Sequence, residues 1–319
     1  MDNRQLLPTV PRGMVVLRKR TLILPVLAFG LAATVAAPAQ ARVTPTALSS
    51  SSVKPLYFSA ALSGGNEVGA PGDPNGSAKS LVTIEGDRVT FAFTWKGITA
   101  PTMGHIHVGA AGVSGGVKVP LFISVMPEVT DGAAGIVTVN DASLVAAITA
   151  HPADFYLNLH TAEFPAGAVR GQLSPARRHR DPLDLLKGLP LQTLMDGNKE
   201  VPVAAGPAVG DPDGQGIAMV RASGRRIQYT VAWAGIGQPM AGHVHLGATG
   251  VSGPVVVPLF LSAVPDNVFA VSGEARGVAK RLVTSIRHAP TGYYVNLHTA
   301  EFPGGAIRGQ LYPAGHIGG

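Results

Sequence analysis

The segment LVTIEGDRVTFAFTW, residues 81–95, alternates apolar and polar side chains on both sides of a Gly-Asp pair. Alternation with a period of two is typical of half-buried β-strands, and Gly-Asp between two such runs indicates a hairpin. The arrangement returns later in the chain, with one run at residues 217–221, a turn at Gly224 and a second run at residues 227–233. The sequence therefore predicts antiparallel β-structure in two places.

The chain repeats itself with an offset of 138 residues. GHIHVGAAGVSGG at 104–116 returns as GHVHLGATGVSGP at 242–254, with nine of 13 positions identical. FYLNLHTAEFPAGAVRGQL at 155–173 returns as YYVNLHTAEFPGGAIRGQL at 293–311, with 15 of 19 identical. One supersecondary unit thus occurs twice, and agreement between the copies indicates which residues the unit needs.

Further apolar runs extend this prediction through the first copy. We expect strands at residues 56–62, 105–108, 117–125, 136–139, 155–160 and 168–173. One helix is expected at residues 141–150, with Asp141 as N-cap and a stop at Pro152, and a longer counterpart at 274–288. The predicted fold is all-β, with two tandem antiparallel Greek-key sandwich or barrel domains that each carry one short helix.

The N-terminus resembles a signal peptide, expected at residues 1–41. Three basic residues precede an apolar run at 21–37, and the small-residue pattern Ala39-Gln40-Ala41 follows. The alternative is a membrane anchor, but Pro25 interrupts a run that is short for a spanning helix. The remaining segments are expected to be a flexible spacer at 42–54, a first domain at 55–174, a basic linker at 175–190, a second domain at 191–313 and a tail at 314–319. The protein is then exported, either periplasmic or secreted, with no membrane span after cleavage.

Charge and cysteine content exclude several classes of protein. The net charge of +6 comes largely from the leader, because 20 basic and 18 acidic residues remain once its five basic and one acidic residues are removed. A net charge of +2 gives no support for a nucleic-acid partner. The absence of cysteine excludes disulfides and thiolate metal sites. The expected partner is an unidentified envelope or extracellular protein or polymer.

Three histidines recur in both copies and suggest a metal site. His105 and His107 are two residues apart, so on a strand they share a face, with Cα atoms about 6.5–7 Å apart. His160 lies on another predicted strand, where Asn158 shares its face. If the two strands are neighbours, three imidazoles meet in a donor set that suits copper or zinc. The second copy has His243, His245 and His298 at the same positions. The alternative is that these histidines only tie strands together through hydrogen bonds.

A glutamate and an arginine also recur, near opposite ends of each copy. We expect Glu67 with Arg170, and Glu200 with Arg308, to form structural ion pairs where the first strand meets the last. A catalytic role is the alternative. Nothing in the sequence indicates a hydrolase, because no Gly-x-Ser-x-Gly elbow is present.

These residues give the chain a resemblance to the CHRD family, first described in the animal protein chordin. The shared motifs are Gly-Asn-Glu-Val at Gly65, His-Ile-His-x-Gly at His105, Gly-Val-Ser-Gly at Gly112, and Asn-Leu-His-Thr through Arg-Gly-Gln-Leu from Asn158 onward, each with its echo. The resemblance implies no established bacterial activity. The chain departs from the family at Ala168 and Ala306, where the family usually has glutamate.

A weaker resemblance is to copper-zinc superoxide dismutase, which also has an H-x-H copper pair, a later histidine and a late arginine. The dismutase's zinc loop, cysteines and bridging histidine have no counterpart here, so the resemblance implies at most a mononuclear copper-like site. The leading hypothesis from the sequence is an exported, non-enzymatic binding or structural module built from two CHRD-type sandwiches. The alternative is a copper- or zinc-binding protein with one three-histidine site per domain, with superoxide dismutase-like activity as an extension of it.

Overall fold

The computed structural model describes residues 54–176, 182–186 and 188–315. The expected signal peptide, nearly all of the spacer, the basic cluster at 177–180 and the last four residues of the tail lie outside the described residues. The described residues all belong to one compact unit that contains both repeats.

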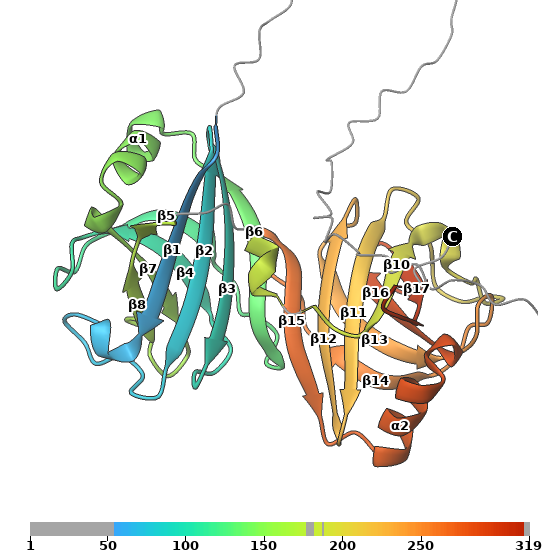
Figure 1. Cartoon of the computed structure of the whole chain (residues 1–319). Helices are drawn as coiled ribbons and strands as arrows, with labels where there is room; N and C mark the ends of the chain where they lie inside the picture. Colours follow the sequence, from blue (N-terminus) through green and yellow to red (C-terminus); the bar gives the residue numbers. More distant parts are fainter. Residues whose placement is uncertain (1–53, 177–181, 187, 316–319) are drawn as a thin grey trace, which may run out of the picture. The chain divides into compact units, whose positions relative to one another are not determined.

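Each repeat contains nine strands and one α-helix (Figure 1). The first repeat comprises β1 (Leu56–Ser63), β2 (Ser77–Glu85), β3 (Arg88–Lys96), β4 (Met103–Val108), β5 (Val117–Phe122), β6 (Thr130–Thr138), α1 (Ala142–Ala150), β7 (Phe155–His160), β8 (Val169–Gln172) and β9 (Ser174–Pro175). The second comprises β10 (Leu191–Asp196), β11 (Gln215–Ser223), β12 (Arg226–Ala234), β13 (Pro239–Leu246), β14 (Val255–Phe260), β15 (Val268–Arg276), α2 (Lys280–His288), β16 (Tyr293–Thr299), β17 (Ile307–Gln310) and β18 (Tyr312–Pro313). Short 3₁₀ turns are η1 (Gly64–Asn66), η2 (Pro152–Asp154), η3 (Pro182–Leu185), η4 (Gly197–Lys199) and η5 (Pro290–Gly292).

The strands of each repeat form two antiparallel four-stranded layers. In the first repeat one layer has the order β1-β2-β3-β6 and the other has the order β5-β4-β7-β8. The chain leaves β3 for the other layer and returns as β6, which is a Greek-key connection. Strands β8 and β9 pair with β1, so the first strand meets the last. The second repeat has the same pairings, and the predicted fold class is confirmed.

The two repeats share one continuous sheet, because β6 pairs antiparallel with β15 (Figure 1). The pairing sets Ala133 opposite Val271, its own counterpart in the second repeat. The Ser272 hydroxyl donates to the Asp131 carboxylate at 2.7 Å across this junction. The repeats therefore associate through the same strand of each, as two subunits of a symmetric dimer do.

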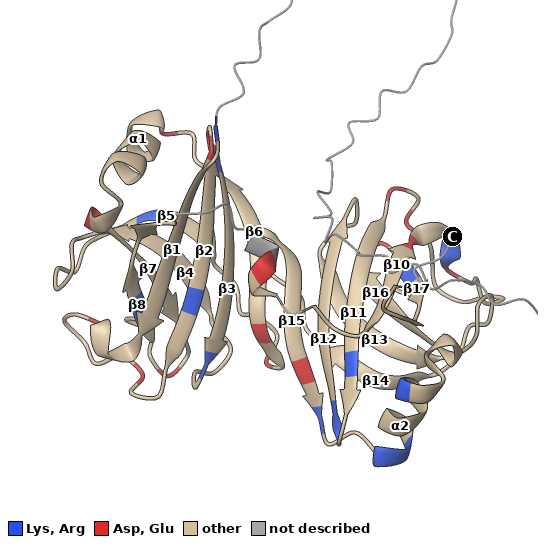
Figure 2. Cartoon of the chain, viewed as in Figure 1, with Lys and Arg blue, Asp and Glu red and all other residues tan. Residues whose placement is uncertain are grey.

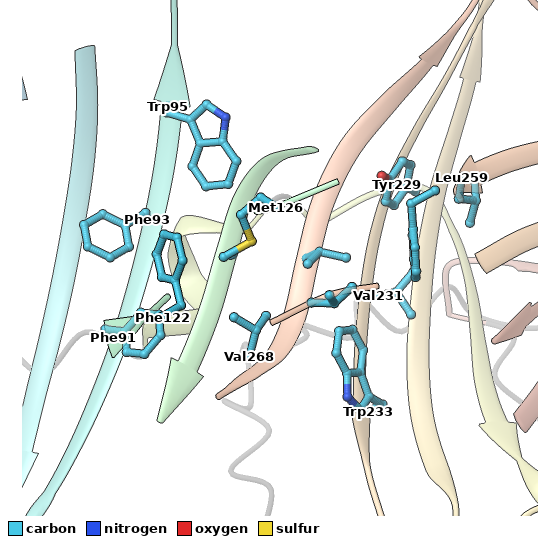
Figure 3. Close-up of a cluster of buried hydrophobic side chains, with 14 of the residues drawn as sticks. Phe91, Phe93, Trp95, Phe122, Met126, Tyr229, Val231, Trp233, Leu259 and Val268 are labelled. Carbon is cyan, nitrogen blue, oxygen red and sulfur yellow. The ribbon is translucent and has the colours of Figure 1, made fainter. Parts of the chain in front are cut away.

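The core lies between the two layers of each sandwich. Strand β3 points Val89, Phe91, Phe93 and Trp95 inward, all 4% exposed or less, as its alternating sequence predicts. Phe91 stacks on Phe122 of β5, with ring centroids 6.4 Å apart. Figure 3 shows these rings together with Met126, and the second repeat's Tyr229, Val231 and Trp233 at the corresponding positions.

Part of the predicted linker is packed against the sheet. Leu186, directly after η3, is 5% exposed and forms a small apolar cluster with Ala92, Ala134 and Ala270. This cluster lies on the face of the sheet that points away from the sandwich core, because alternate residues of a strand face opposite sides. Its members come from both repeats and from the segment between them.

The largest differences from the sequence prediction are in the boundaries of three elements. Strand β6 begins at Thr130 rather than 136, since the small residues at 132–135 pair with β3 on one side and β15 on the other. Strand β5 ends at Phe122 rather than 125. The second helix was predicted too long: Glu274 lies in β15 opposite Gln228, Gly277 turns the chain at φ +74°, and α2 has nine residues, as α1 has.

The described residues contain no helix with the length and apolar character that crossing a membrane requires. Figure 2 shows their basic and acidic residues spread thinly over both repeats.

Candidate metal centre

The recurring polar residues lie on the outward face of the β5-β4-β7-β8 layer. On β7 the side chains of Leu157 and Leu159 enter the core, so Asn158 and His160 point the other way. The register sets Asn158 opposite His105 on β4. Neighbouring strands thus bring together residues that are 53 positions apart in the sequence.

Although it faces outward, this row of residues is buried. His105, His107 and His160 are 6%, 8% and 6% exposed. Loops cover them: the loop after β4 reaches His107 through the Gly115 carbonyl, and the loop after β7 reaches His160 through the Pro165 carbonyl. The site is therefore a closed polar compartment between a sheet and its loops.

Hydrogen bonds to these carbonyl groups determine which nitrogen of each ring is free. His107 donates from Nδ1 to Gly115 O at 3.0 Å, and His160 donates from Nδ1 to Pro165 O at 3.0 Å. A neutral imidazole has one N–H, so Nε2 of each ring carries a lone pair. His160 Nε2 lies 3.1 Å from His105 Nδ1, whereas His107 Nε2 is buried with no partner. One nitrogen of each ring lies within 4.8 Å of a nitrogen of the other two. The hydrogen bonds leave Nε2 of His107 and of His160 as the free donors, and His105 presents Nδ1 to His160.

The second repeat has the same arrangement. His245 and His298 donate from Nδ1 to the carbonyls of Gly253 and Pro303, both at 2.9 Å. His243 Nδ1 lies 2.9 Å from His298 Nε2, and His245 Nε2 is again buried without a partner. The structure thus brings together both predicted triads, His105, His107 and His160, and His243, His245 and His298.

Burial keeps these histidines neutral. Burial, reinforced by the neighbouring His160 and His107, lowers the pKa of His105 from 6.5 to about 4. In the second repeat, burial and the neighbouring His298 and His245 lower the pKa of His243 to about 4. Burial also lowers the pKa of the other four histidines, His107, His160, His245 and His298. Neutral imidazole is the form that binds a metal ion.

The geometry suits zinc or copper. Zinc-to-nitrogen bonds of about 2.0–2.1 Å in a tetrahedral site place two ligand nitrogens roughly 3.4 Å apart. The observed separations between His105 and His160, and between His243 and His298, are slightly shorter, at 3.1 and 2.9 Å. Metal-binding histidines also usually donate their second N–H to a carbonyl or carboxylate, as four of these six rings do.

A tyrosine that our sequence analysis missed supports each triad. The Tyr156 ring stacks on His107, with centroids 4.8 Å apart and planes 13° apart. The Arg170 guanidinium carbon lies 3.4 Å from the centroid of the Tyr156 ring. Tyr294 stacks in the same way between His245 and Arg308. The available signal was that Tyr156 recurs in both copies and shares a strand face with Asn158 and His160.

The predicted ion pairs do not form between the described side chains. Arg170 donates through Nη2 to Ala110 O at 2.9 Å and to Val113 O at 2.7 Å. Glu67 instead accepts from Asn158 Nδ2 at 3.0 and 3.1 Å. The first and last strands do meet, at Ser63 opposite Arg170, as expected. The arginine, however, turns toward the loop after β4, where it acts as an anchor.

The second repeat requires the same correction for Glu200 and Arg308. Arg308 donates to the carbonyl oxygens of Ala248 and Val251 at 3.0 and 2.9 Å. Glu200 accepts from Asn296. Burial raises the pKa of each glutamate, to about 7 for Glu67 and about 8 for Glu200. The positive charge of the arginine in the same repeat opposes this rise, so each arginine still acts on its glutamate at longer range.

Fold and site together define a tandem β-sandwich protein with one three-histidine cluster per domain, buried in the first domain and partly buried in the second. The CHRD domain family matches residues 58–173 and 191–311, most of the chain. The chain therefore belongs to the CHRD domain family, with two tandem domains. No curated protein matches it.

Proposed function

We propose that this is an exported metal-binding protein in which each CHRD domain holds one copper or zinc ion through three histidines. The observation that carries the proposal is a buried lone pair without a partner, on His107 Nε2 and again on His245 Nε2. Leaving a buried acceptor unsatisfied costs about 1–3 kcal/mol, and both repeats accept this penalty at the same atom. A metal ion bound to the triad removes it.

Metal analysis of the purified full chain tests the proposal. After loading with zinc or copper and removal of free ion, we expect two ions per chain. His107→Ala should remove one ion, and His107→Ala combined with His245→Ala should remove both. His288→Ala is the matched control, because His288 is exposed and bonds only to Thr284 O within its own helix. No bound ion in the unmodified chain, or two ions in the double variant, contradicts the proposal.

A second candidate is the non-enzymatic binding or structural module. The observation that favours it is the hydrogen bond between His105 and His160, which joins β4 to β7 without any ion. On this account zinc leaves the thermal unfolding temperature unchanged, and the chain retains a specific partner from envelope extracts. A rise in unfolding temperature on zinc addition that His107→Ala abolishes contradicts it.

Superoxide chemistry is an extension of the metal proposal. Copper bound to three imidazoles can cycle between two oxidation states, and the copper-loaded chain is the form to assay for dismutase activity. His107→Ala is the control there too. Activity no greater than that of the control shows that the site binds metal without dismutating superoxide.

Export rests on the leader pattern at residues 1–41. We expect the mature protein, recovered from the periplasm or the medium, to begin at Arg42. N-terminal sequencing measures this, and recovery of the intact N-terminus in the cell interior contradicts it.

A further inference from the structure

We propose that Asn158 and Asn296 supply a fourth donor, an amide oxygen, to the metal ion in their own repeat. Glu67 and Glu200 hold each amide in the orientation that this requires. The inference rests on the proposed metal-binding function and specifies its ligand set as three nitrogens and one oxygen.

Asn158 and Asn296 each lie beside the histidines of their own repeat. Asn158 lies directly opposite His105 in the β4–β7 register and two residues before His160, on the same face. Side chains directly opposite in an antiparallel pair have Cβ atoms about 4.5–5.5 Å apart. Asn Oδ1 and His Nδ1 are each two bonds beyond Cβ, so both reach the same space above the sheet. Asn296 lies opposite His243 in the same way.

A hydrogen bond to a glutamate orients the side-chain amide of each asparagine. Asn158 Nδ2 donates to both carboxylate oxygens of Glu67, at 3.0 and 3.1 Å. When it is ionised, Glu67 only accepts hydrogen bonds, so the amide nitrogen faces Glu67 and the amide oxygen faces away from it. Asn296 donates to Glu200 and has the same orientation. Reversing either amide would set oxygen against oxygen.

The amide oxygens of Asn158 and Asn296 lack hydrogen-bond partners. Asn158 and Asn296 are each 2% exposed, yet Oδ1 of both has no hydrogen-bond partner. Among the described residues, seven buried side-chain atoms have no hydrogen-bond partner, and four of them are in the two sites. They are the same two atoms in each repeat: the histidine Nε2 of His107 or His245, and the amide Oδ1 of Asn158 or Asn296. One cation per repeat would satisfy both at once.

The backbone at Gly167 and at Gly305 packs closely against the Glu–Asn pair of its repeat. A Cβ at Gly167 would lie 2.6 Å from Glu67 Oε2 and 2.8 Å from Asn158 Nδ2, so only glycine fits there. Gly167 also has φ +148°, which disfavours other residues. Gly305 meets Glu200 and Asn296 in the same way. The pair is therefore a built part of the site in both repeats.

A neutral amide oxygen makes the donor set harder than three imidazoles alone. Oxygen donors favour divalent ions, whereas Cu(I) prefers softer sulfur ligands. The site is thus expected to hold Zn(II) or Cu(II) in preference to Cu(I).

Removing the amide oxygen in the full chain tests the inference. With Asn158→Leu plus Asn296→Leu, we expect two Cu(II) ions still to bind at saturating copper. Affinity, measured by competition with a chelator, should fall by roughly tenfold to a hundredfold. The copper hyperfine splitting in the electron paramagnetic resonance spectrum should change. Glu67→Gln plus Glu200→Gln lets the amides reverse and should weaken binding in the same direction.

Asn140→Leu is the matched control, because Asn140 is exposed and outside both sites. Unchanged affinity and spectrum in the Asn158 and Asn296 variant overturn this inference and leave the three-histidine site intact. No copper bound to the unmodified chain overturns the metal function itself, and this inference with it.

A second measurement uses the unmodified chain. It therefore tests the inference even if the variant with Asn158→Leu plus Asn296→Leu does not fold. In the ¹⁵N-labelled unmodified chain, zinc loading should shift the side-chain amide resonances of Asn158 and Asn296 more than that of Asn140. Equal shifts for all three overturn the inference.

Discussion

At the scale of single residues, backbone carbonyls decide what the histidines can do. The Gly115 and Pro165 carbonyls fix the tautomers of His107 and His160, so both rings present Nε2 to the centre. His105 presents Nδ1, which in the metal-free state donates to His160 Nε2. Metal binding then requires only that this proton move to Nε2 of His105, with no change in the net charge of the three rings.

Arg170 is predicted to stabilise the fold through the loop after β4. Arg170→Met removes two charge-assisted hydrogen bonds and the contact with the Tyr156 ring. We expect a loss of about 2–4 kcal/mol in the free energy of unfolding. Urea denaturation of the metal-free chain measures it. Arg221→Met, at an exposed position, should change stability by less than about 0.5 kcal/mol. Equal effects of the two substitutions would show that Arg170 is no anchor.

The buried glutamates predict a pH dependence of stability. Burial raises the pKa of Glu67 to about 7 and that of Glu200 to about 8, above the ordinary 4.5. A raised pKa in the folded state means that stability is full below 4.5 and falls as the pH rises toward 7–8. Glu67→Gln plus Glu200→Gln removes this fall. The unfolding temperature of the metal-free variant, relative to the unmodified chain, should therefore increase from pH 4.5 to pH 8. If the difference in unfolding temperature between the variant and the unmodified chain is constant with pH, it contradicts the raised pKa values of Glu67 and Glu200.

At the scale of elements, local sequence signals predicted most of the fold. The hairpin of β2 and β3 and the N-cap of α1 follow from alternation and from Asp141, whose carboxylate accepts from Leu144 N at 3.0 Å. The early start of β6 was not predictable, because its small residues at 132–135 form a strand only through pairing with β3 and β15. The start of α2 was missed because Gly277 is the only break between β15 and α2, and the N-cap residue Ala279 has no capping side chain that would mark the start of the helix.

In the site, too, local sequence signals identified some residues, and contacts that depend on tertiary structure were missed. Period-two spacing and the repeat identified all six histidines. The partners of Arg170 and Glu67 were missed because they depend on how the loops after β4 and β7 fold back over the sheet. Loop conformation of this kind is set by tertiary contacts rather than by local pattern.

The two helices differ in capping, which gives a paired prediction. Asp141 caps α1, whereas the N-cap of α2 is Ala279, whose side chain makes no capping hydrogen bond. Asp141→Ala should cost about 1 kcal/mol in the free energy of unfolding, and Ala279→Ser should gain up to about 1 kcal/mol. Thermal unfolding of the two variants measures both changes. Effects of the same sign would contradict this account of the helices.

At the scale of the whole molecule, the β6–β15 junction makes one sheet of two domains. Its strands pair antiparallel from Thr130 opposite Gly273 to Gly135 opposite Val268, with a register shift near each end, and the main apolar cluster includes residues of both repeats. The two histidine clusters therefore belong to a single folding unit.

Binding at one site is predicted to stabilise both repeats. In a chain carrying His245→Ala, zinc binds only the first repeat. Zinc at about one hundred times its dissociation constant adds roughly 2.7 kcal/mol of stability. Calorimetry should show one transition that moves upward by about 5 °C or more. Two transitions, of which only one moves, would show that the repeats unfold independently.

The central claim is that each domain binds one metal ion through one Nδ1 and two Nε2 atoms. Anomalous diffraction from a crystal of the zinc-loaded full chain, measured at the zinc edge, tests it most directly. We predict two peaks per chain, each about 2.0–2.1 Å from the three histidine nitrogens of its repeat: His105 Nδ1, His107 Nε2 and His160 Nε2, and the corresponding atoms of His243, His245 and His298. Histidine triads without anomalous density in a zinc-saturated crystal would contradict the account.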